Sequence, residues 1–286
     1  MKSSDASRAD VLDRLTTKTF WDSTWSRPAE GRQRARRIRR LESLDWQMGR
    51  LLVETVASAR STGGRLSILE IGCANSIWLP FLGRRTGAEV VGVDYSERGC
   101  RLAELNLAAM NIKGTIVCAD FVDYVRRAPS SCDVVVSFGL IEHFSDVSGV
   151  LSKMVTLLKP GGVLLATVPN LAGVYGPMQQ VIDAEVLRQH VILTPGALAE
   201  HGRQAGLVNV TSGYVGGPLR LSALNLAHVS WLPALVSRVI VRGLFELDSA
   251  VSTVLRVSGR DIAPPAHAPY AYMRGAAETE PVAVRA

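Results

Sequence analysis

The sequence predicts an α/β protein with a doubly wound, mostly parallel sheet of seven strands. First, the apolar run Ser67–Ile71 ends in a turn of small residues, and a helical pattern begins at Trp78. Second, short β-branched runs and helical segments alternate from residue 66 to residue 170. Third, these runs are apolar at successive positions, which is typical of strands that are buried on both faces of a parallel sheet.

The composition favours one large domain with additions. The chain has 286 residues, and 47% of them are hydrophobic. This length and hydrophobic content are enough to bury a full core. The net charge is +6. Its cysteines stand singly, without the spacing of a metal site, at positions 73, 100, 118 and 132. We therefore expect reduced thiols, no metal and a cytoplasmic protein. A charged-then-apolar signal pattern is absent from the first residues, so secretion is not expected.

Residues 1–60 are predicted to form an N-terminal arm and cap helices. Trp21 and Trp25 must bury somewhere, either on the core or as a flap that contacts a substrate. Helical periodicity covers residues 29–59, with an arginine run opposite its apolar stripe: Arg32, Arg34, Arg36, Arg37, Arg39 and Arg40. We interpret this run as a solvated helix face. An anionic substrate or a membrane surface stays open, whereas nucleic acid is disfavoured because no aromatic residues interleave with the charges.

The remaining residues, 61–286, are predicted to form one ligand-binding domain. Ser61–Gly64 is a linker, and strands are expected over residues 66–71, 89–94, 115–120, 133–138 and 163–168. Between them, helices are expected over residues 77–86, 97–110, 121–127 and 147–158, followed by a turn at Lys159–Gly162. Ligands of such sheets bind at the carboxyl ends of the strands.

The last third of the chain departs from this alternation. Residues 171–192 are expected as a long connection, and Thr194 then caps a helix that runs to Ala205 before a strand over residues 207–213. Residues 218–262 are predicted to be an apolar helical insertion, either buried or on a dimer surface, with a membrane contact or a substrate tunnel as alternatives. An edge strand over residues 268–273 and a flexible tail over residues 275–286 complete the chain.

The small-residue turn distinguishes between two ligand classes. The G-x-G-x-x-G pattern of a dinucleotide site would place Gly72, Ala74 and Ile77 at the three glycine positions, and isoleucine prevents close helix–strand packing. Glu70 precedes Gly72 by two residues, and a carboxylate there suits a cationic ligand and repels a pyrophosphate.

These residues resemble the motifs of class I S-adenosylmethionine-dependent methyltransferases. Glu70–Ser76 looks like the first motif, and Asp94 looks like the acid that binds both ribose hydroxyls. Ala119–Phe121 resembles the adenine motif, Ser137–Asp146 the motif beside the methyl donor, and Leu158–Val163 the turn that follows it. The resemblance covers residues 66–170 and implies a Rossmann-like fold with S-adenosylmethionine as cofactor.

The resemblance also implies a set of cofactor-binding residues. Ala74 and Ser76 stand where the family commonly has glycine, and a positive φ at either would cost roughly 1 kcal/mol or more. Asn75 tolerates that geometry better. The full set comprises Glu70, Gly72, Cys73, Ala74, Asn75, Ser76, Asp94, Tyr95, Asp120, Phe121, Ser137, Phe138 and Gly139.

The functional hypothesis is a methyltransferase that acts on an oxygen or nitrogen of a small, apolar or lipid-like acceptor, such as a natural product. Glu142, His143 and His190 are the candidates for a catalytic base. Candidate acceptor contacts are Trp21, Trp25, Tyr175, Gln179 and Tyr214. Methylation of RNA or protein, and a non-catalytic partner protein, are the alternatives. The chain is expected to be a monomer or a homodimer.

Overall fold

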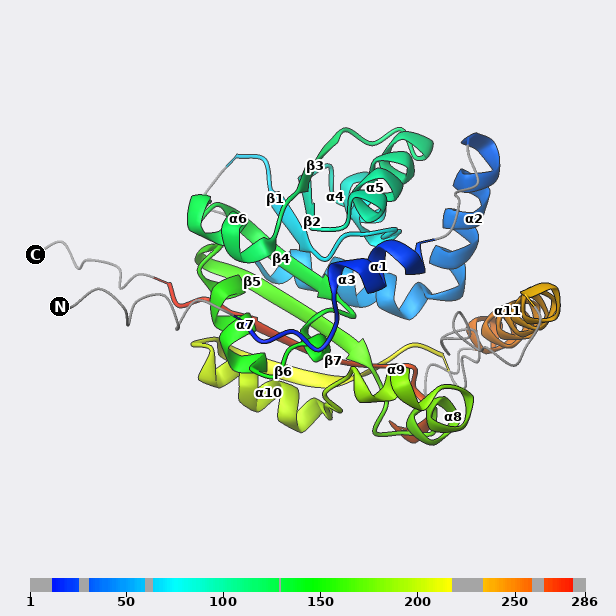
Figure 1. Cartoon of the computed structure of the whole chain (residues 1–286). Helices are drawn as coiled ribbons and strands as arrows, with labels where there is room; N and C mark the ends of the chain where they lie inside the picture. The colour runs from blue at the N-terminus through cyan, green and yellow to red at the C-terminus, as the bar shows by residue number, and fades with distance from the viewer. Residues whose placement is uncertain are drawn as a thin grey trace, which may run out of the picture.

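A seven-stranded sheet crosses the protein with the strand order β3-β2-β1-β4-β5-β7-β6 (Figure 1). The computed structural model describes residues 12–25, 31–59, 64–128, 130–217, 234–258 and 265–279. The strands are β1 (Ser67–Ile71), β2 (Glu89–Asp94), β3 (Gly114–Cys118), β4 (Cys132–Phe138), β5 (Leu158–Pro169), β6 (Val208–Val215) and β7 (Tyr270–Ala276).

The strand order reverses at β1, which pairs in parallel with both β2 and β4. Ile68 lies opposite Val90 on one side and Val134 on the other. The strands β3 to β5 extend this parallel arrangement, and only β7 runs antiparallel, between β5 and β6. The predicted seven-stranded, mostly parallel sheet is confirmed. Its ligand crevice is expected beyond the carboxyl ends of β1 and β4, where the order reverses.

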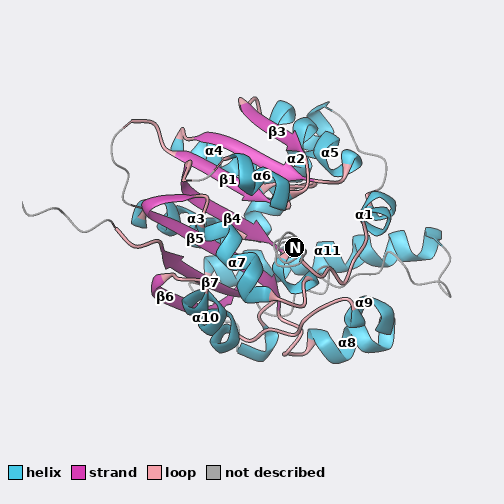
Figure 2. Cartoon of the chain, turned by 60° about the vertical axis from the view of Figure 1, so that its left-hand side comes forward, coloured by secondary structure: helices cyan, strands magenta, loops and turns pink. Residues whose placement is uncertain are grey.

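Helices cover both faces of the sheet (Figure 2). Up to β4 they are α1 (Lys18–Thr24), α2 (Gly31–Leu44), α3 (Trp46–Ser58), α4 (Trp78–Thr86), α5 (Glu97–Ala109) and α6 (Phe121–Arg127). After β4 come η1 (Ile141–His143), α7 (Val147–Val155), α8 (Tyr175–Ile182), α9 (Ala184–Arg188), α10 (Pro195–Gln204), α11 (Ala234–Val257) and η3 (Pro265–His267).

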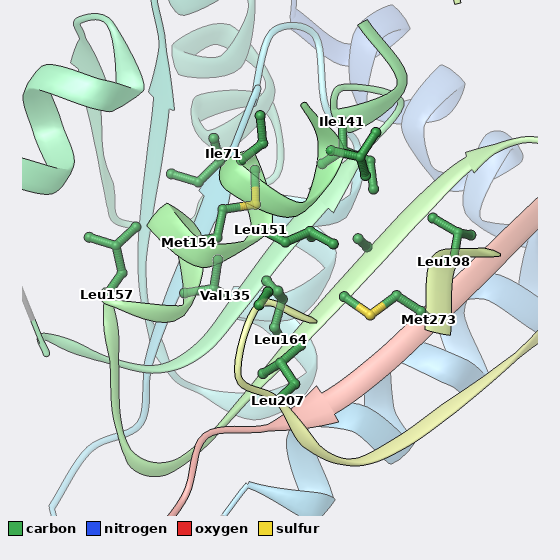
Figure 3. Close-up of a cluster of buried hydrophobic side chains, with 14 of the residues drawn as sticks. Ile71, Val135, Ile141, Leu151, Met154, Leu157, Leu164, Leu198, Leu207 and Met273 are labelled. Carbon is green, nitrogen blue, oxygen red and sulfur yellow. The ribbon is translucent and has the colours of Figure 1, made fainter. Parts of the chain in front are cut away.

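Each face of the sheet has its own hydrophobic core. On one face, Leu151 and Met154 of α7 pack with Leu198 of α10 against Leu164 of β5 (Figure 3). On the other face, α3 and α4 pack through Leu52 and Leu82. These side chains are almost completely buried, so the central strands are continuously apolar because both of their faces are covered.

The local predictions fail at three places in the second half of the chain. Lys159–Gly162 is not a turn between elements but part of β5, where Gly161 has a φ of +75° and the pairing with β4 shifts register. The expected connection over 171–192 contains α8 and α9, the latter capped by the Asp183 carboxylate. The expected edge strand is β7, which lies inside the sheet, so that β6 forms the edge.

The helical additions also differ from the prediction. The helical stretch over 29–59 is two helices that meet at Asp45. The described part of the insertion contains α11, and several of its apolar side chains are exposed: Val239 is 65% exposed and Val254 is 67% exposed. Residues 218–233 and 259–262 of the insertion lie outside the described residues. Within the described residues, no helix has the length and apolar character needed to cross a membrane.

The expected C-terminal tail begins later than predicted. The strand β7 continues to Ala276, two residues into the predicted tail, because these residues pair with β5 and β6. Residues 280–286 of the tail lie outside the described residues.

A buried carboxylate joins the amino-terminal ends of three central strands. Asp133 of β4 accepts hydrogen bonds from the backbone N–H of Ser67 at 2.9 Å and from its hydroxyl at 2.7 Å. Lys159 of β5 donates to the same carboxylate at 2.9 Å. The side chain of Asp133 is only 2% exposed, so this charge depends on these donors.

We predict that Asp133→Ala lowers the free energy of unfolding by about 2–4 kcal/mol, because it leaves a buried N–H and a lysine without their acceptor. Urea titration followed by circular dichroism measures this change. Asp123→Ala is the control, since the exposed Asp123 pairs only within α6 with Arg126, and a shift below about 0.5 kcal/mol is expected. Equal shifts in the two variants would contradict the prediction.

Candidate active site

The turn after β1, here called the Gly72 loop (residues 72–77), has a left-handed backbone at two positions. Gly72 has a φ of +78° and Asn75 a φ of +54°, whereas Ala74 and Ser76 have ordinary negative φ. Asn75 takes the left-handed position, as its tolerance of that geometry suggested. Ala74 and Ser76 therefore cost the loop no backbone strain.

Asp94, at the carboxyl end of β2, fixes the shape of this loop. One of its carboxylate oxygens accepts the backbone N–H of Ala74 at 3.1 Å, and the other accepts that of Ser96 at 2.8 Å. The Gly72 loop packs closely against α5, because a Cβ at Gly99 of α5 would lie 2.4 Å from the Cβ of Ala74. Burial raises the pKa of Asp94 above its ordinary value, while these backbone hydrogen bonds oppose the rise.

Glu70 lies beneath the same loop and is only 1% exposed. Its carboxyl group accepts a hydrogen bond from the hydroxyl of Ser76 at 2.9 Å. Ser76 also accepts the backbone N–H of Trp78, which begins α4. Burial raises the pKa of Glu70 from 4.5 to about 8.

A cavity opens at the carboxyl ends of β1, β2 and β4, beside the Gly72 loop. Nine of the predicted site residues line it: Trp21, Trp25, Gly72, Ala74, Asp94, Tyr95, Phe121, Gly139 and His143. Four further lining residues belong to the predicted motifs but not to the set of site residues: Ile71, Ala119, Leu140 and Phe144. The sequence did not predict the other three, which are Arg14, Thr16 and Val93.

The remaining predicted residues are not among the residues that line this cavity. One group belongs to the elements around it: Glu70, Cys73, Asn75, Ser76, Asp120, Ser137, Phe138, Glu142 and His190. A second group lies on α8 and β6: Tyr175, whose hydroxyl donates to the carbonyl of His267 at 3.3 Å, the buried Gln179, and Tyr214, which pairs with Ala271.

The N-terminal arm closes one side of the cavity. Arg14 forms an ion pair with Asp120, and its guanidinium lies 5.0 Å from the centre of the Tyr95 ring. The backbone N–H of Leu15 donates to the carbonyl of His143 at 2.8 Å. Trp21 and Trp25 stack with ring centres 5.9 Å apart, and the indole N–H of Trp25 is buried without a hydrogen-bond partner. The arm thus supplies aromatic walls and one unused donor.

Glu142, His143 and His190 come together at the side of the cavity. His143 and His190 have ring centres 4.3 Å apart, and Trp21 packs edge-on against His143. Burial lowers the pKa of His143 to about 3 and also lowers that of His190. Burial raises the pKa of Glu142 to about 8.

Arg34 is a site residue that the sequence did not reveal. It was expected on a solvated helix face, but it is only 5% exposed. Its guanidinium donates to the side-chain oxygen of Asn106 at 2.6 Å, to the carbonyl of Leu102 and to the side chain of Asn75. Arg34 therefore connects α2 and α5 to the Gly72 loop. Only its neighbours in space distinguish it from the other arginines of the run.

The comparisons with known proteins agree with this geometry. A family model described as a methyltransferase domain matches residues 31–212, more than half of the chain. The chain belongs to this family of methyltransferase domains.

Two similar proteins illustrate the relationship. The ubiquinone biosynthesis O-methyltransferase of Aeromonas salmonicida is 30% identical over 151 residues, which cover 49% of this chain and 62% of that protein. The chain thus spans less than two thirds of that relative. The crystal structure of a SAM-dependent methyltransferase from Archaeoglobus fulgidus aligns with a TM-score of 0.52 and 19% identity over 80% of this chain and 92% of that one. At this identity, the structural likeness shows the fold alone.

We predict that the ligand-free protein loses stability as the pH rises, because of Glu70. Folding raises the pKa of the Glu70 carboxyl group, so protonation of this group stabilises the folded state. This stabilisation is fully present below about pH 4.5 and is lost as the pH rises to about 8. Between these limits, wild type should lose about 1.4 kcal/mol per pH unit relative to Glu70→Gln. Urea titrations at pH 5, 6, 7 and 8 measure the difference. Parallel profiles for the two proteins would refute the assignment.

We further predict that Arg34→Met destabilises the protein by about 2–4 kcal/mol, because buried oxygens lose a charged donor. The matched control is Arg36→Met, since Arg36 is exposed on the same helix. Thermal unfolding of both variants tests this, with little change expected in the control. If the Arg34 side chain were instead exposed to solvent, both substitutions would lower the unfolding temperature by similar, small amounts.

Proposed function

We propose that the chain is an S-adenosylmethionine-dependent O-methyltransferase of a small, apolar or lipid-like acceptor. The observation that carries the proposal is Asp94, whose carboxylate lines the cavity and is held by the backbone of Ala74 and Ser96. Each carboxylate oxygen uses one lone pair for these bonds and keeps a second for a ligand hydroxyl. Two oxygens that face a cavity in this way suit the two hydroxyls of a ribose.

Several other features of the cavity fit the same cofactor. A positive φ at Gly72, together with the absence of a side chain there, allows a close approach to the backbone. Asp94 and the aromatic residues Trp21, Tyr95 and Phe144 line the cavity, and a carboxylate together with aromatic rings suits a sulfonium cation. In this proposal, residues 1–60 form the cap and residues 61–286 form the cofactor-binding domain.

The bound cofactor supplies a methyl group on a sulfur that is already an activated leaving group. The protein's own contribution is to hold the acceptor in line with that methyl group and to exclude water. The arm residues Trp21 and Trp25 exclude water on one side of the cavity. The cluster of Glu142, His143 and His190 is the group proposed to accept the acceptor proton. With its pKa lowered to about 3, His143 is a weak base by itself.

The choice of acceptor rests on two supports. The relatives with about 30% identity are named O-methyltransferases of ubiquinone biosynthesis, which favours an oxygen acceptor. The cavity is lined mostly by apolar and aromatic side chains, which favours an apolar acceptor.

The four cysteines are free, and three of them are buried, which supports a reducing, cytoplasmic setting.

We predict that Asp94→Ala weakens S-adenosylhomocysteine binding on the order of 100-fold or more, because two hydrogen bonds to a charged acceptor are lost. Isothermal titration calorimetry of the full chain measures the affinity. Glu97→Ala is the control, since Glu97 is an exposed neighbour on α5 that pairs with Lys18. No measurable binding to wild type, or equal binding to Asp94→Ala, would overturn the proposal.

A further inference from the structure

A cluster of three side chains that can each bind a metal ion lies beside the cavity. Glu142, His143 and His190 each offer one ligand atom, and these atoms lie within 4.8 Å of one another. Glu142 is 1% exposed and His143 is 4% exposed, so two of the three are cut off from solvent. Both carboxylate oxygens of Glu142 are buried without a hydrogen-bond partner. A buried carboxylate in this condition needs a cation or a proton.

The hydrogen bonds of the two histidines decide where their lone pairs lie. The Nδ1 atom of His143 lies 2.8 Å from the carbonyl oxygen of Gln189, and that of His190 lies 2.6 Å from the carbonyl oxygen of Val186. A carbonyl oxygen only accepts hydrogen bonds, so both Nδ1 atoms carry the proton. In the neutral rings, both Nε2 atoms therefore present a lone pair. A backbone carbonyl on the other ring nitrogen is the usual support of a metal-binding histidine.

The backbone holds this arrangement in place. The N–H of Val191 donates to the carbonyl of Glu142 at 2.7 Å, which fastens the residues after α9 to η1. Behind the cavity wall, the carboxylate of Glu142 also lies close to Gly139, where a Cβ would be only 3.5 Å from one of its oxygens. The cluster is thus both rigid and next to the cavity.

We infer that Glu142, His143 and His190 bind a divalent cation of the zinc class at the wall of the cofactor cavity. One carboxylate and two imidazoles are the ligand set of catalytic zinc sites, which leave a further position for water or substrate. Ligand atoms about 2.0–2.2 Å from a tetrahedral ion are separated by about 3.3–3.6 Å. The ligand atoms of the cluster lie within 4.8 Å of one another, so the widest pair would move about 1 Å closer when the ion binds.

The charges support the same assignment. The cluster contains one acid and two neutral rings, and no basic side chain of the described residues forms an ion pair with Glu142. A hard cation such as Mg²⁺ prefers oxygen ligands and keeps several waters, whereas two imidazoles favour zinc and its neighbours. This inference replaces the expectation of a metal-free site. The sequence did not suggest a metal, because His190 lies far from Glu142 and His143 along the chain and shows no metal-site spacing with them.

Only the role of this cation depends on the proposed function. A hydroxyl of the acceptor bound at the open position would lose its proton to water, because the cation lowers the pKa of a bound hydroxyl. The resulting oxygen would then form a bond to the methyl carbon, as the carbon–sulfur bond breaks and its electron pair remains on sulfur. With the cation bound, this route takes the place of proton transfer to the cluster itself, because the lone pairs of the ligand atoms are then bound to the cation.

The test is a Co²⁺ titration of the untagged full chain after treatment with a chelator. We expect one ion per chain, with visible d–d absorption, and two strongly shifted Nδ1–H proton resonances from the two ligating imidazoles. Glu142→Gln and His190→Ala should each weaken binding on the order of 100-fold or more. The matched control is His201→Ala, since His201 bonds to the Ser148 hydroxyl between α7 and α10 and should bind Co²⁺ as wild type does.

Each other outcome overturns the inference. These outcomes are no saturable binding to wild type, an unchanged affinity in either cluster variant, equal loss in His201→Ala, or bound Co²⁺ without shifted imidazole protons. The shifted resonances need only the wild type, so they test the site even if a variant fails to fold. Calorimetry with S-adenosylhomocysteine on the same samples separates the two proposals, because cofactor binding and Co²⁺ binding can each fail alone.

Discussion

Buried negative charge is the constraint on which this site depends. Glu70, Asp94 and Glu142 are each at most 9% exposed, and all three lie around one cavity. Within the described residues, no ion pair joins any of them to a basic side chain. Backbone N–H groups compensate Asp94 and a hydroxyl compensates part of Glu70, while Glu142 has no donor. Burial raises the pKa of all three carboxyl groups, so a cationic ligand beside them would stabilise their charged forms. A sulfonium and a divalent cation both satisfy this requirement.

The cavity is lined by the carboxyl ends of sheet strands and by the N-terminal arm. The carboxyl ends of β1, β2 and β4 place Gly72, Asp94 and Gly139 at one edge, where parallel pairing fixes their spacing. The arm then adds Arg14, Trp21 and Trp25 from the opposite side. Its contacts are an ion pair, ring stacking and a few hydrogen bonds, whereas the sheet is held by continuous pairing and two buried cores. The arm is thus the wall that fewer interactions hold in place.

Much of the sheet and of the Gly72 loop could be predicted from the sequence, because strand and loop signals are local. The order of β1 to β5 and the capping of α10 by Thr194 follow from patterns within a few residues. The position of β7 could not be predicted, since its alternating burial pattern does not reveal whether a second strand lies beyond it. Arg34 and the meeting of His190 with His143 depend on contacts between distant segments. The sequence left open whether the apolar residues of α11 are buried or form a dimer surface, because an apolar composition does not by itself indicate burial.

The interior position of β7 has a consequence for how the fold is completed. Within the described residues, the edge strand β6 pairs only with β7, although β7 follows it in the chain only after the whole of α11. During synthesis, β1 to β5 can therefore form their parallel core before β6 has its partner. The sheet can be completed only after Tyr270–Ala276 has been made, because β6 joins the sheet through β7. A nascent chain that stops before Tyr270 would thus carry a nearly complete cofactor cavity beside an unfinished sheet edge, the kind of surface that recruits chaperones.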